Sequence, residues 1–568
     1  MKNPTPANPT MIDTILFEHF ATLATAPDGI ARLRELILHL AVQGQLGTQD
    51  TGDEPASKLS SKILEEKKRL IKKGEISKSR ALPEIESGEI PFQIPKNWIW
   101  LRLDDIGNSC GQKEPDKVFT YIDVTAINKE RGRIGDDVNV LQPNEAPSRA
   151  RKLVKKGSVI YSTVRPYLLN IAIVDKDFNP EPIVSTAFAV LHPFEGIFNR
   201  YLFYYLRSTP FVEYVESQMT GMAYPAINDQ KFHMGLIPVP PTAEQHRIVT
   251  KVDRLMALCD ELETRQQQER ADCLKLGTAS LAGLQNAEMP EEFKRQWMQV
   301  YEEFELIFDC QENVETLRQT ILQMAVQGRL VRQDSRDEPA RELLKKIKND
   351  YKFSSRINEK LKSQIDRKDD KKWILPSGWT LCQLGSVAEI IMGNSPPGDT
   401  YNTRGDGIPL INGPTEFSKG PLGKTIIRQY STQPTKQCIK NDLLICVRGS
   451  TTGRTNLAGF DGCIGRGVAA IRAPLIQSYL NLFLITKTQH FLNINSGLAF
   501  PSISQSDLTN YYFPLPPLAE QHRIVAKVDA LMALCDALES RLKERAVIQS
   551  RFADTVAKRI GAGCCNET

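Results

Sequence analysis

The chain has 568 residues, and at about 100 to 200 residues per domain this length predicts roughly three to five domains. Its 41% hydrophobic and 25% charged residues are typical of a globular protein and exclude a disordered, collagen-like or fibrous chain. The formal net charge of +4 is too small to indicate or exclude a nucleic-acid partner.

Targeting and metal-binding signals are sparse in this sequence. No apolar stretch approaches the roughly 20 residues that a membrane-spanning helix needs. Residues 1–10 are polar and proline-rich, without the layout of a signal peptide, so we expect a cytoplasmic protein with no membrane partner. The 11 cysteines include no C-x-x-C pair, and we expect buried thiols and no metal site.

Two segments of the sequence each occur twice. Residues 240–265 and 516–541 are identical at 21 of 26 positions, with AEQHRIV and LMALCD in both. Residues 33–63 and 317–347 are identical at 18 of 31 positions, with AVQG and DEPA in both. The matches keep the same order, so the chain is predicted to hold two copies of one unit. Each copy has a leading helical segment, an insert of about 145 residues and a closing helical segment.

This duplication predicts five regions. They are an N-terminal helical segment (1–91), a first insert (92–241), a central helical spacer (242–372), a second insert (373–517) and a C-terminal helical spacer (518–568). Residues 351–372 are rich in lysine and lack periodicity, which predicts a linker or a frayed helix end.

The closing segments have the 4-3 apolar spacing of a coiled-coil seam. The seam positions are Ile248, Val252, Leu255, Cys259 and Leu262 in the first copy, and Ile524, Val528, Leu531, Cys535 and Leu538 in the second. Each helix is predicted to span some 30 residues, or about 45 Å. Thr242 and Gln245 are predicted to form a capping box, for which Leu518 offers no equivalent.

The inserts contain short β-rich runs broken by Gly, Pro and Asn, and each also holds an apolar helical run. The predicted strands are 121–124, 158–164, 183–191, 443–447 and 468–471, and the predicted helices are 200–215 and 479–492. The fold class is therefore α+β, with two mixed α/β domains on long helices. An internal duplication of this kind can pack about an approximate two-fold axis.

The sequence contains no complete catalytic or nucleotide-binding signature. Gly465 to Ala470 spells G-x-G-x-x-A, but no clear strand precedes it and no acidic residue follows at the distance that dinucleotide binding needs. Gly420 to Thr425 has the wrong spacing for a phosphate-binding loop. Glu244 and His246 recur in the second copy within a helix start, which favours a structural role for both. We find no methyltransferase or nuclease signature, so we expect no catalytic residue in this chain.

Recognition is the function that the duplication favours, because the helical segments are similar while the inserts diverge. Two inserts at a fixed spacing suit double-stranded DNA, whose half-sites face one side when they lie a helical turn or its multiple apart. The first insert has 17 basic and 16 acidic residues, and the second has 11 and 7. Charge therefore supports DNA binding only in part.

The candidate DNA-binding residues lie at a basic cluster, at two turns after predicted strands, and at the end of each insert. In the first insert they are Arg149, Arg151, Lys152, Ser162, Thr163, Arg165, Tyr167 and Asn228. In the second they are Arg448, Ser450, Thr451, Arg454, Ser502 and Ser504. Basic side chains can hold phosphates, and an arginine can also grip guanine O6 and N7. The aromatic residue and the isoleucine in Tyr224 to Ile227 and in Phe500 to Ile503 are predicted to be core.

The doubled AEQHRIV and AVQG…DEPA segments, together with the YSTVRPYL and VRGSTTG turns, resemble the specificity subunits of type I restriction-modification systems. The resemblance covers nearly the whole chain. It implies two target-recognition domains, each reading half of a bipartite asymmetric DNA site, on antiparallel helical spacers. It also implies two modification and two restriction subunits as partners, with S-adenosylmethionine, ATP and Mg bound in those subunits and no cofactor in this chain.

Two other functions remain open at this point. A coiled-coil adaptor without DNA specificity would show no salt-dependent DNA affinity, whereas DNA recognition predicts an affinity that falls steeply with salt. A cryptic enzyme would need a catalytic constellation, and the sequence offers none.

Overall fold

The structure, a computed structural model, describes residues 23–46, 49–76, 82–136, 138–221, 223–287, 289–350, 375–420, 422–493 and 502–562. The chain divides into two compact units, one of residues 1–268 with 545–568 and the other of residues 269–544. Two helices of 45 residues each, α8 (Thr242–Asn286) and α16 (Leu518–Ala562), begin in one unit and end in the other.

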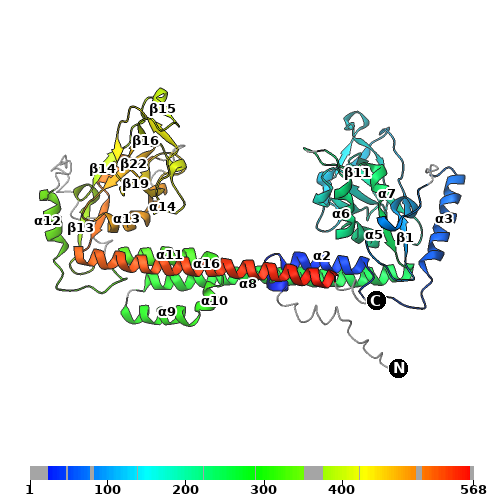
Figure 1. Cartoon of the computed structure of the whole chain (residues 1–568), viewed down its shortest axis with the longest axis horizontal. Coiled ribbons are helices and arrows are strands. Elements are labelled where there is room, and N and C mark those ends of the chain that lie inside the picture. Colours follow the sequence, from blue (N-terminus) through cyan, green and yellow to red (C-terminus); the bar gives the residue numbers. More distant parts are fainter. Residues whose placement is uncertain are drawn as a thin grey trace. The chain divides into compact units, whose positions relative to one another are not determined.

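In the first unit, α2 (Gly29–Val42) packs along the first part of α8 and the last part of α16 (Figure 1). Gln266 of α8 donates to the carbonyl oxygen of Ala24, and Lys251 donates to that of Leu46, so α2 runs antiparallel to α8. Arg32 of α2 contacts Asp554 of α16 at 3.0 Å. The first unit therefore includes the end of α16, a helix that begins in the other unit.

The second unit repeats this arrangement with α11 (Gln311–Val326) in place of α2. Arg318 contacts Glu539 of α16 at 3.1 Å, and Gln285, near the end of α8, donates to Thr320 at 2.8 Å. Two shorter helices, α9 (Pro290–Glu302) and α10 (Phe304–Phe308), lie between α8 and α11 in sequence. The first half of each closing helix therefore packs in its own unit, and the second half packs in the other unit.

The predicted seam positions are buried or partly buried. Ile248, Val252 and Cys259 are at most 4% exposed, and the corresponding Ile524, Val528 and Cys535 are at most 3% exposed. The remaining four leucines of the seams, Leu255, Leu262, Leu531 and Leu538, are partly buried against the same cores. The predicted helix length of about 30 residues is wrong, because each helix continues to 45 residues where it joins the other unit.

The first insert is built from three sheets and several short helices. Its strands are β1 (Ile99–Arg102), β2 (Gly107–Asn108), β3 (Phe119–Ile122), β4 (Ile127–Asn128), β5 (Arg133–Ile134), β6 (Asn139–Leu141), β7 (Ala150–Leu153), β8 (Val159–Ser162), β9 (Ile171–Ile173), β10 (Pro182–Ser185), β11 (Phe188–Pro193) and β12 (Leu236–Val239). Its helices are α4 (Leu103–Ile106), α5 (Asn199–Leu206), α6 (Thr209–Gln218) and α7 (Asp229–Met234). The sheets have the orders β6-β3-β10-β7, β2-β11-β8-β9-β5-β4 and β1-β12.

The second insert follows the same plan with fewer residues. Its strands are β13 (Thr380–Gln383), β14 (Glu389–Met392), β15 (Tyr401–Asn402), β16 (Ile408–Ile411), β17 (Gln429–Ser431), β18 (Gln437–Cys438), β19 (Leu443–Cys446), β20 (Thr455–Leu457), β21 (Gly462–Ile464), β22 (Val468–Arg472) and β23 (Tyr512–Leu515). Its helices are α13 (Gln477–Ile485), α14 (Thr488–Asn493) and α15 (Gln505–Thr509). The sheets have the orders β14-β22-β19-β20, β15-β17-β16-β21-β18 and β13-β23.

The predicted strands and helices of the inserts are confirmed, with two refinements. Residues 183–191 form parts of two strands, β10 and β11, and each predicted helix is a pair of helices, α5 with α6 and α13 with α14. The segment 351–372, predicted to be a linker or a frayed helix end, lies outside the described residues. Among the described helices, none combines the length and the apolar character that crossing a membrane requires.

A joint of identical residues ties each insert to the start of its closing helix. The indole nitrogen of Trp98 donates to the buried Glu244 at 2.9 Å, and Trp379 donates to Glu520 at 3.0 Å. Both tryptophans belong to short matching segments near the start of the inserts, IPKNW at residues 94–98 and LPSGW at residues 375–379. Glu244 and Glu520 therefore hold the domains in place, as the structural interpretation of their recurrence predicts.

The DEPA motifs complete the joint. Asp53 pairs with Arg247, and in the second copy Asp337 pairs with Arg523 at 2.6 Å. Both aspartates come from the loops that precede α3 (Ala56–Lys72) and α12 (Ala340–Asp350), and both arginines lie in the second turns of the closing helices. In each copy, the DEPA motif thus supplies the aspartate of an ion pair and the AEQHRIV motif supplies its arginine.

The predicted capping box at Thr242 is wrong. Thr242 is already helical, and its hydroxyl donates to the carbonyl oxygen of Gly196 at 3.0 Å. The Gln245 side chain accepts from the backbone N–H of Phe198 and donates to Gly196 and Pro240. His246 packs its ring on Phe198 at 4.3 Å between centroids. These side chains fasten the helix to the insert instead of capping it.

Candidate nucleic-acid interface

The turns that follow β8 and β19 occupy the same place in the two inserts. In each, the strand pairs with its antiparallel neighbour, β11 or β22, and the ladder continues past the strand end through Thr163 N–H to Ala187 and Val447 N–H to Gly467. The same residue then accepts from the segment before α7 or α15, through Ile227 or Ile503. Thr163 therefore corresponds to Val447.

This correspondence places the two turn arginines one position apart. Arg448 takes the place of Val164, and Gly449 takes the place of Arg165. The backbone is left-handed at the second position in both turns, with φ of 49° at Arg165 and 82° at Gly449. A non-glycine residue is strained there, and such strain clusters at functional sites. The recurrence of the turn is real, but the arginines within it point from different positions.

In the first insert, Arg165 lies over the exposed ring of Tyr224, with its guanidinium carbon 5.0 Å from the ring centroid. Tyr224 is 69% exposed, so its predicted place in the core is wrong, whereas the neighbouring Ile227 is buried as predicted. Tyr167 is also exposed. The turn therefore presents a cation held against an aromatic face, a combination suited to bases and phosphates alike. The equivalent Phe500 lies outside the described residues.

The basic cluster before β8 is only partly at the surface. Arg149 is exposed, while Arg151 pairs with Glu114 at 3.1 Å. Lys152 is 6% exposed, because its ammonium group donates to the carbonyl oxygen of Phe188 and pairs with Asp229. A buried and paired lysine is unavailable to a phosphate at the surface, and Lys152 leaves the candidate set.

Two hydroxyl candidates are likewise buried. Ser162 is 1% exposed and donates to the carbonyl oxygen of Val164, and Thr163 is 6% exposed and donates to that of Ala187. Both hydroxyls shape the turn instead of facing a ligand. The sequence prediction for them is wrong because the hydrogen bonds between the strands continue past the end of β8 to Thr163, so both hydroxyls stay in the interior.

Asn228 and Ser504 correspond to each other as helix caps. The Asn228 side chain accepts from Lys231 N–H at the start of α7, and Ser504 accepts from Asp507 N–H at the start of α15. Both residues are exposed and lie beside the arginine turns, since the bridges Val164–Ala226 and Arg448–Ser502 join the two segments. Capping is their observed role, and contact with a ligand remains a prediction.

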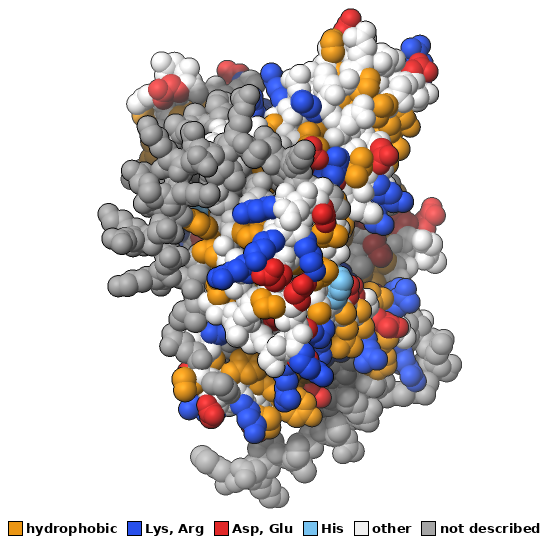
Figure 2. Space-filling view, turned by 90° about the vertical axis from the view of Figure 1, so that its left-hand side faces the viewer, with side chains coloured by type: hydrophobic (Ala, Val, Ile, Leu, Met, Phe, Trp, Pro, Cys, Tyr) orange, Lys and Arg blue, Asp and Glu red, His pale blue; other side chains and the backbone are white. Residues whose placement is uncertain are grey.

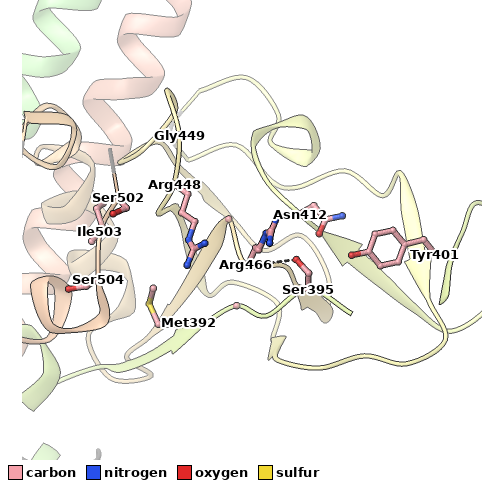
Figure 3. Close-up of a pocket in the computed structure, with 12 residues that line it drawn as sticks. Met392, Ser395, Tyr401, Asn412, Arg448, Gly449, Arg466, Ser502, Ile503 and Ser504 are labelled. Carbon is pink, nitrogen blue, oxygen red and sulfur yellow. Dashed lines mark hydrogen bonds between the residues drawn. The ribbon is translucent and has the colours of Figure 1, made fainter. Parts of the chain in front are cut away.

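The second insert has an open hollow of about 1010 Å³ at these strand ends (Figure 3). It gathers three of the predicted residues, Arg448, Ser502 and Ser504. The other lining residues are Met392, Gly393, Ser395, Tyr401, Asn412, Gly449, Arg466, Gly467 and Ile503. Ser450 and Arg454 are exposed on the same turn and Thr451 is half-buried, but these three do not line the hollow.

On α12 of the second unit, basic side chains are paired with acidic ones. On α12, Lys345 pairs with Glu342 at 2.8 Å and Lys346 pairs with Glu338 at 2.8 Å. Figure 2 shows basic and acidic side chains interspersed on the face seen there. The hollow differs, because its described lining holds two arginines and no carboxylate. Local composition rather than net charge therefore marks the candidate surface.

The polar groups beneath the two sheets also differ. In the first insert, the buried Ser158 contacts His192 Nδ1 at 3.1 Å, and burial, with the nearby Lys155, lowers the pKa of His192 to about 4. The corresponding positions in the second insert hold Asp442 and Arg472, joined at 2.8 Å and 3.0 Å. The neutral Ser158–His192 pair of the first insert is thus replaced by the Asp442–Arg472 ion pair at the same place in the second.

The described residues contain no group of three His, Cys, Asp or Glu side chains able to hold a metal ion. The described cysteines are free thiols, and burial raises the pKa of Cys382 to about 12. A thiol with such a pKa is a poor nucleophile and a poor metal ligand at neutral pH.

Sequence reasoning missed Arg466, Ser395 and Asn412 at the hollow and Tyr224 at the first turn. Arg466 lies inside the G-x-G-x-x-A run, whose resemblance to a dinucleotide-binding motif drew attention to its glycines and not to its arginine. The signal that finds it is the pair of glycines around a single arginine directly before a strand.

The chain matches the profile of the type I restriction modification DNA specificity domain twice, over residues 95–270 and 376–546. The Escherichia coli protein named type I restriction enzyme EcoAI specificity subunit is 30% identical over 556 residues, which cover 93% of each chain. The EcoEI specificity subunit, also from Escherichia coli, is 30% identical over 560 residues with the same coverage.

A solved structure described as the "Structural basis underlying complex assembly and conformational transition of the type I R-M system" is also similar. Its chain is 29% identical, with a TM-score of 0.52, and the match covers 83% of the present chain and 99% of that chain. Together with the doubled profile match, these similarities show that the chain belongs to the family of type I restriction-modification DNA specificity subunits. It is a non-catalytic subunit of such a system.

Proposed function

We propose that the two inserts are target-recognition domains, each of which reads one half of a bipartite asymmetric site in double-stranded DNA. The helical segments dock two modification subunits and two restriction subunits, and S-adenosylmethionine, ATP and Mg bind in those partners. The adaptor function without DNA specificity is the alternative that the experiment below addresses.

The observation that carries this proposal is one turn geometry with two different sets of side chains. Position 164/448 is Val in one domain and Arg in the other, and position 165/449 is Arg over Tyr224 in one and Gly in the other. A shared backbone that presents different donors is what reading two different base sequences requires. A scaffold that bound the same protein partner twice would be expected to keep these side chains alike.

Within each half-site, contacts with phosphates set the position of the domain and contacts with base edges supply the sequence preference. The exposed Arg149 of the first insert is suited to phosphates, as is Arg454, which is exposed on the second turn but does not line the hollow. Arg165 and Arg448 are the residues for base edges. Replacing Arg448 with Ala should weaken binding to one half-site by about 1 to 3 kcal/mol.

The long helices set the gap between the half-sites. Because α8 and α16 are each continuous over 45 residues, an insertion within them should change the tolerated gap and leave the bases unchanged. Retention of the original gap would contradict this role.

The test is selection of DNA sequences by the chain co-purified with its modification subunit, repeated across a series of salt concentrations. We expect an asymmetric consensus in two parts with a fixed gap, and an affinity that falls steeply as salt rises. An assembled complex that bound DNA without sequence preference, or not at all, would refute the proposal and favour the adaptor.

A further inference from the structure

Two arginines of the second recognition domain face each other across the ends of neighbouring strands. β19 and β22 are antiparallel, with Cys446 opposite Val468, and Val447 N–H donates to Gly467 at 2.9 Å. Arg448 directly follows Val447 and Arg466 directly precedes Gly467, so both arginines lie where the two strands end, and both line the same hollow. Arg448 is bridged to Ser502, and Arg466 lies in the turn that leads into β22.

The backbone around Arg466 is built to hold that side chain alone at the surface. A Cβ atom on Gly465 would lie 2.2 Å from Asn412 Oδ1, and one on Gly467 would lie 2.8 Å from the carbonyl oxygen of Asn412. Arg466 itself is anchored by its N–H, which donates to Ser395 Oγ at 3.2 Å (Figure 3). The G-R-G run is therefore a tight turn with one projecting side chain, not a nucleotide fingerprint.

A third glycine, Gly393 after β14, packs against the same turn. A Cβ atom on Gly393 would lie 2.2 Å from the carbonyl oxygen of Gly465 and 2.6 Å from that of Val468. The end of β14 thus lies directly against the turn. A turn held on both sides fixes the backbone from which Arg466 projects, and a rigid backbone favours specific contacts.

The charges of this pair are not balanced within the domain. Neither guanidinium has an acidic partner among the described residues, and no carboxylate is part of the described lining of the hollow. Two like charges that line one hollow without a counter-charge repel each other. The first domain avoids this arrangement, because Val164 and Thr186 occupy the corresponding positions.

We propose that Arg448 and Arg466 form a pair that reads guanine in the half-site bound by the second recognition domain. This inference rests on the proposed function and names the base that the hollow takes. Each guanidinium presents a donor fork that matches the O6 and N7 acceptors of guanine, and the two forks lie at neighbouring positions in the hollow. The hydroxyl of Ser395 and the amide of Asn412 lie beside Arg466, while Ser504 lies across from Arg448 (Figure 3).

A phosphate contact would use the same charge, so the experiment must separate the two. The complex with the modification subunit is used for sequence selection with the wild-type chain, R466Q and R466K. Arg336, an exposed arginine paired with Asp334 outside the recognition domains, supplies the matched control R336Q.

We expect the wild-type chain to select guanine in the second half-site. R466Q and R466K should both relax that preference by about 5- to 150-fold at one position and leave the first half-site unchanged. R336Q should change nothing. Lysine keeps the charge but lacks the two-pronged donor, so it should not restore the preference.

Three results would overturn the inference. One is a half-site without guanine. Another is uniform weakening across all sequences, with lysine restoring affinity, which would show a phosphate contact. The third is a marked fall in the melting temperature of R466Q, which would show a structural role. If the wild-type complex selects no bipartite site at all, the proposed function fails instead, so the two failures are distinguishable.

Discussion

The joint that holds each recognition domain on its helix and the edge at which the domain meets its ligand have diverged to different degrees. At the joint, the Trp98–Glu244 bond recurs as Trp379–Glu520, and the Asp53–Arg247 pair recurs as Asp337–Arg523. At the edge, Arg448 takes the place of Val164, and Arg466 takes the place of Thr186. The difference indicates that attachment is constrained to be equal in the two halves, whereas recognition is free to differ.

The layer beneath the edge has diverged as well, and it offers the largest expected effect. Asp442 is 2% exposed and holds Arg472 through two hydrogen bonds. Asp442→Ala removes the buried partner of Arg472 and leaves it only Glu389, at 3.2 Å, so we expect a loss of about 3 kcal/mol in the stability of the second unit. Chemical denaturation of the variant would measure this loss. Ser158→Ala at the corresponding position should lose only about 1 kcal/mol, and equal losses would contradict the comparison.

The joint should respond equally in the two halves. Glu244→Ala leaves the Trp98 indole without its partner, and Glu520→Ala does the same to Trp379. A buried donor without a partner costs about 1 to 3 kcal/mol, and we expect the two variants to agree within about 0.5 kcal/mol. Denaturation curves of both variants test this. A large difference between them would show that the two joints are not equivalent.

Acid should act on the first domain through His192. Burial lowers its pKa to about 4 from an unfolded value near 6.5, so the unfolded state binds more protons between these values. The contribution of neutral His192 to the stability of the first unit is complete above about pH 6.5 and is lost as the pH falls toward 4. Because the ring is partly exposed, we expect a loss of no more than about 1 to 2 kcal/mol by pH 5.

Melting of the wild-type chain and His192→Gln across this pH range is the measurement. The variant should lose part of the acid dependence of the first unit, while the second unit has Arg472 at this position and no such group. An unchanged acid dependence in the variant would contradict the assignment to His192.

The smallest expected effect concerns the opposed arginines. Because Arg448 and Arg466 repel each other without a carboxylate in the described lining, Arg448→Gln or Arg466→Gln should leave stability unchanged or raise it by about 0.2 to 1 kcal/mol. A calorimetric scan of each variant would show this. A stabilised variant with relaxed sequence preference would mark residues that serve recognition at the expense of the fold.

Much of this architecture is predictable from the sequence, because the duplication is strong and the seam positions recur at helical spacing. The exchange of helix ends between the units is not predictable in this way, since the second halves of α8 and α16 lack the clear 4-3 pattern of the first halves. The pairing of Asp53 with Arg247 joins residues 194 positions apart, and only the fold brings them together.

The candidate site is less predictable than the fold. Matching the letters VRP and VRG aligns Arg165 with Arg448, whereas the strand register shows that they differ by one position. Composition alone likewise could not separate the exposed Arg149 from the buried Lys152, three residues further along. Which residues face a ligand depends on where each strand ends, and strand boundaries are the least certain part of any sequence-based prediction.

The most direct test of two independent readers is a hybrid chain in which residues 92–241 replace residues 373–517. Sites methylated by the hybrid in complex with its modification subunit would be compared with those of the wild-type complex. We predict that both halves of the new site match the half-site of the first domain and that the original second half-site is lost. Retention of the original second half-site would contradict the assignment of one domain to each half.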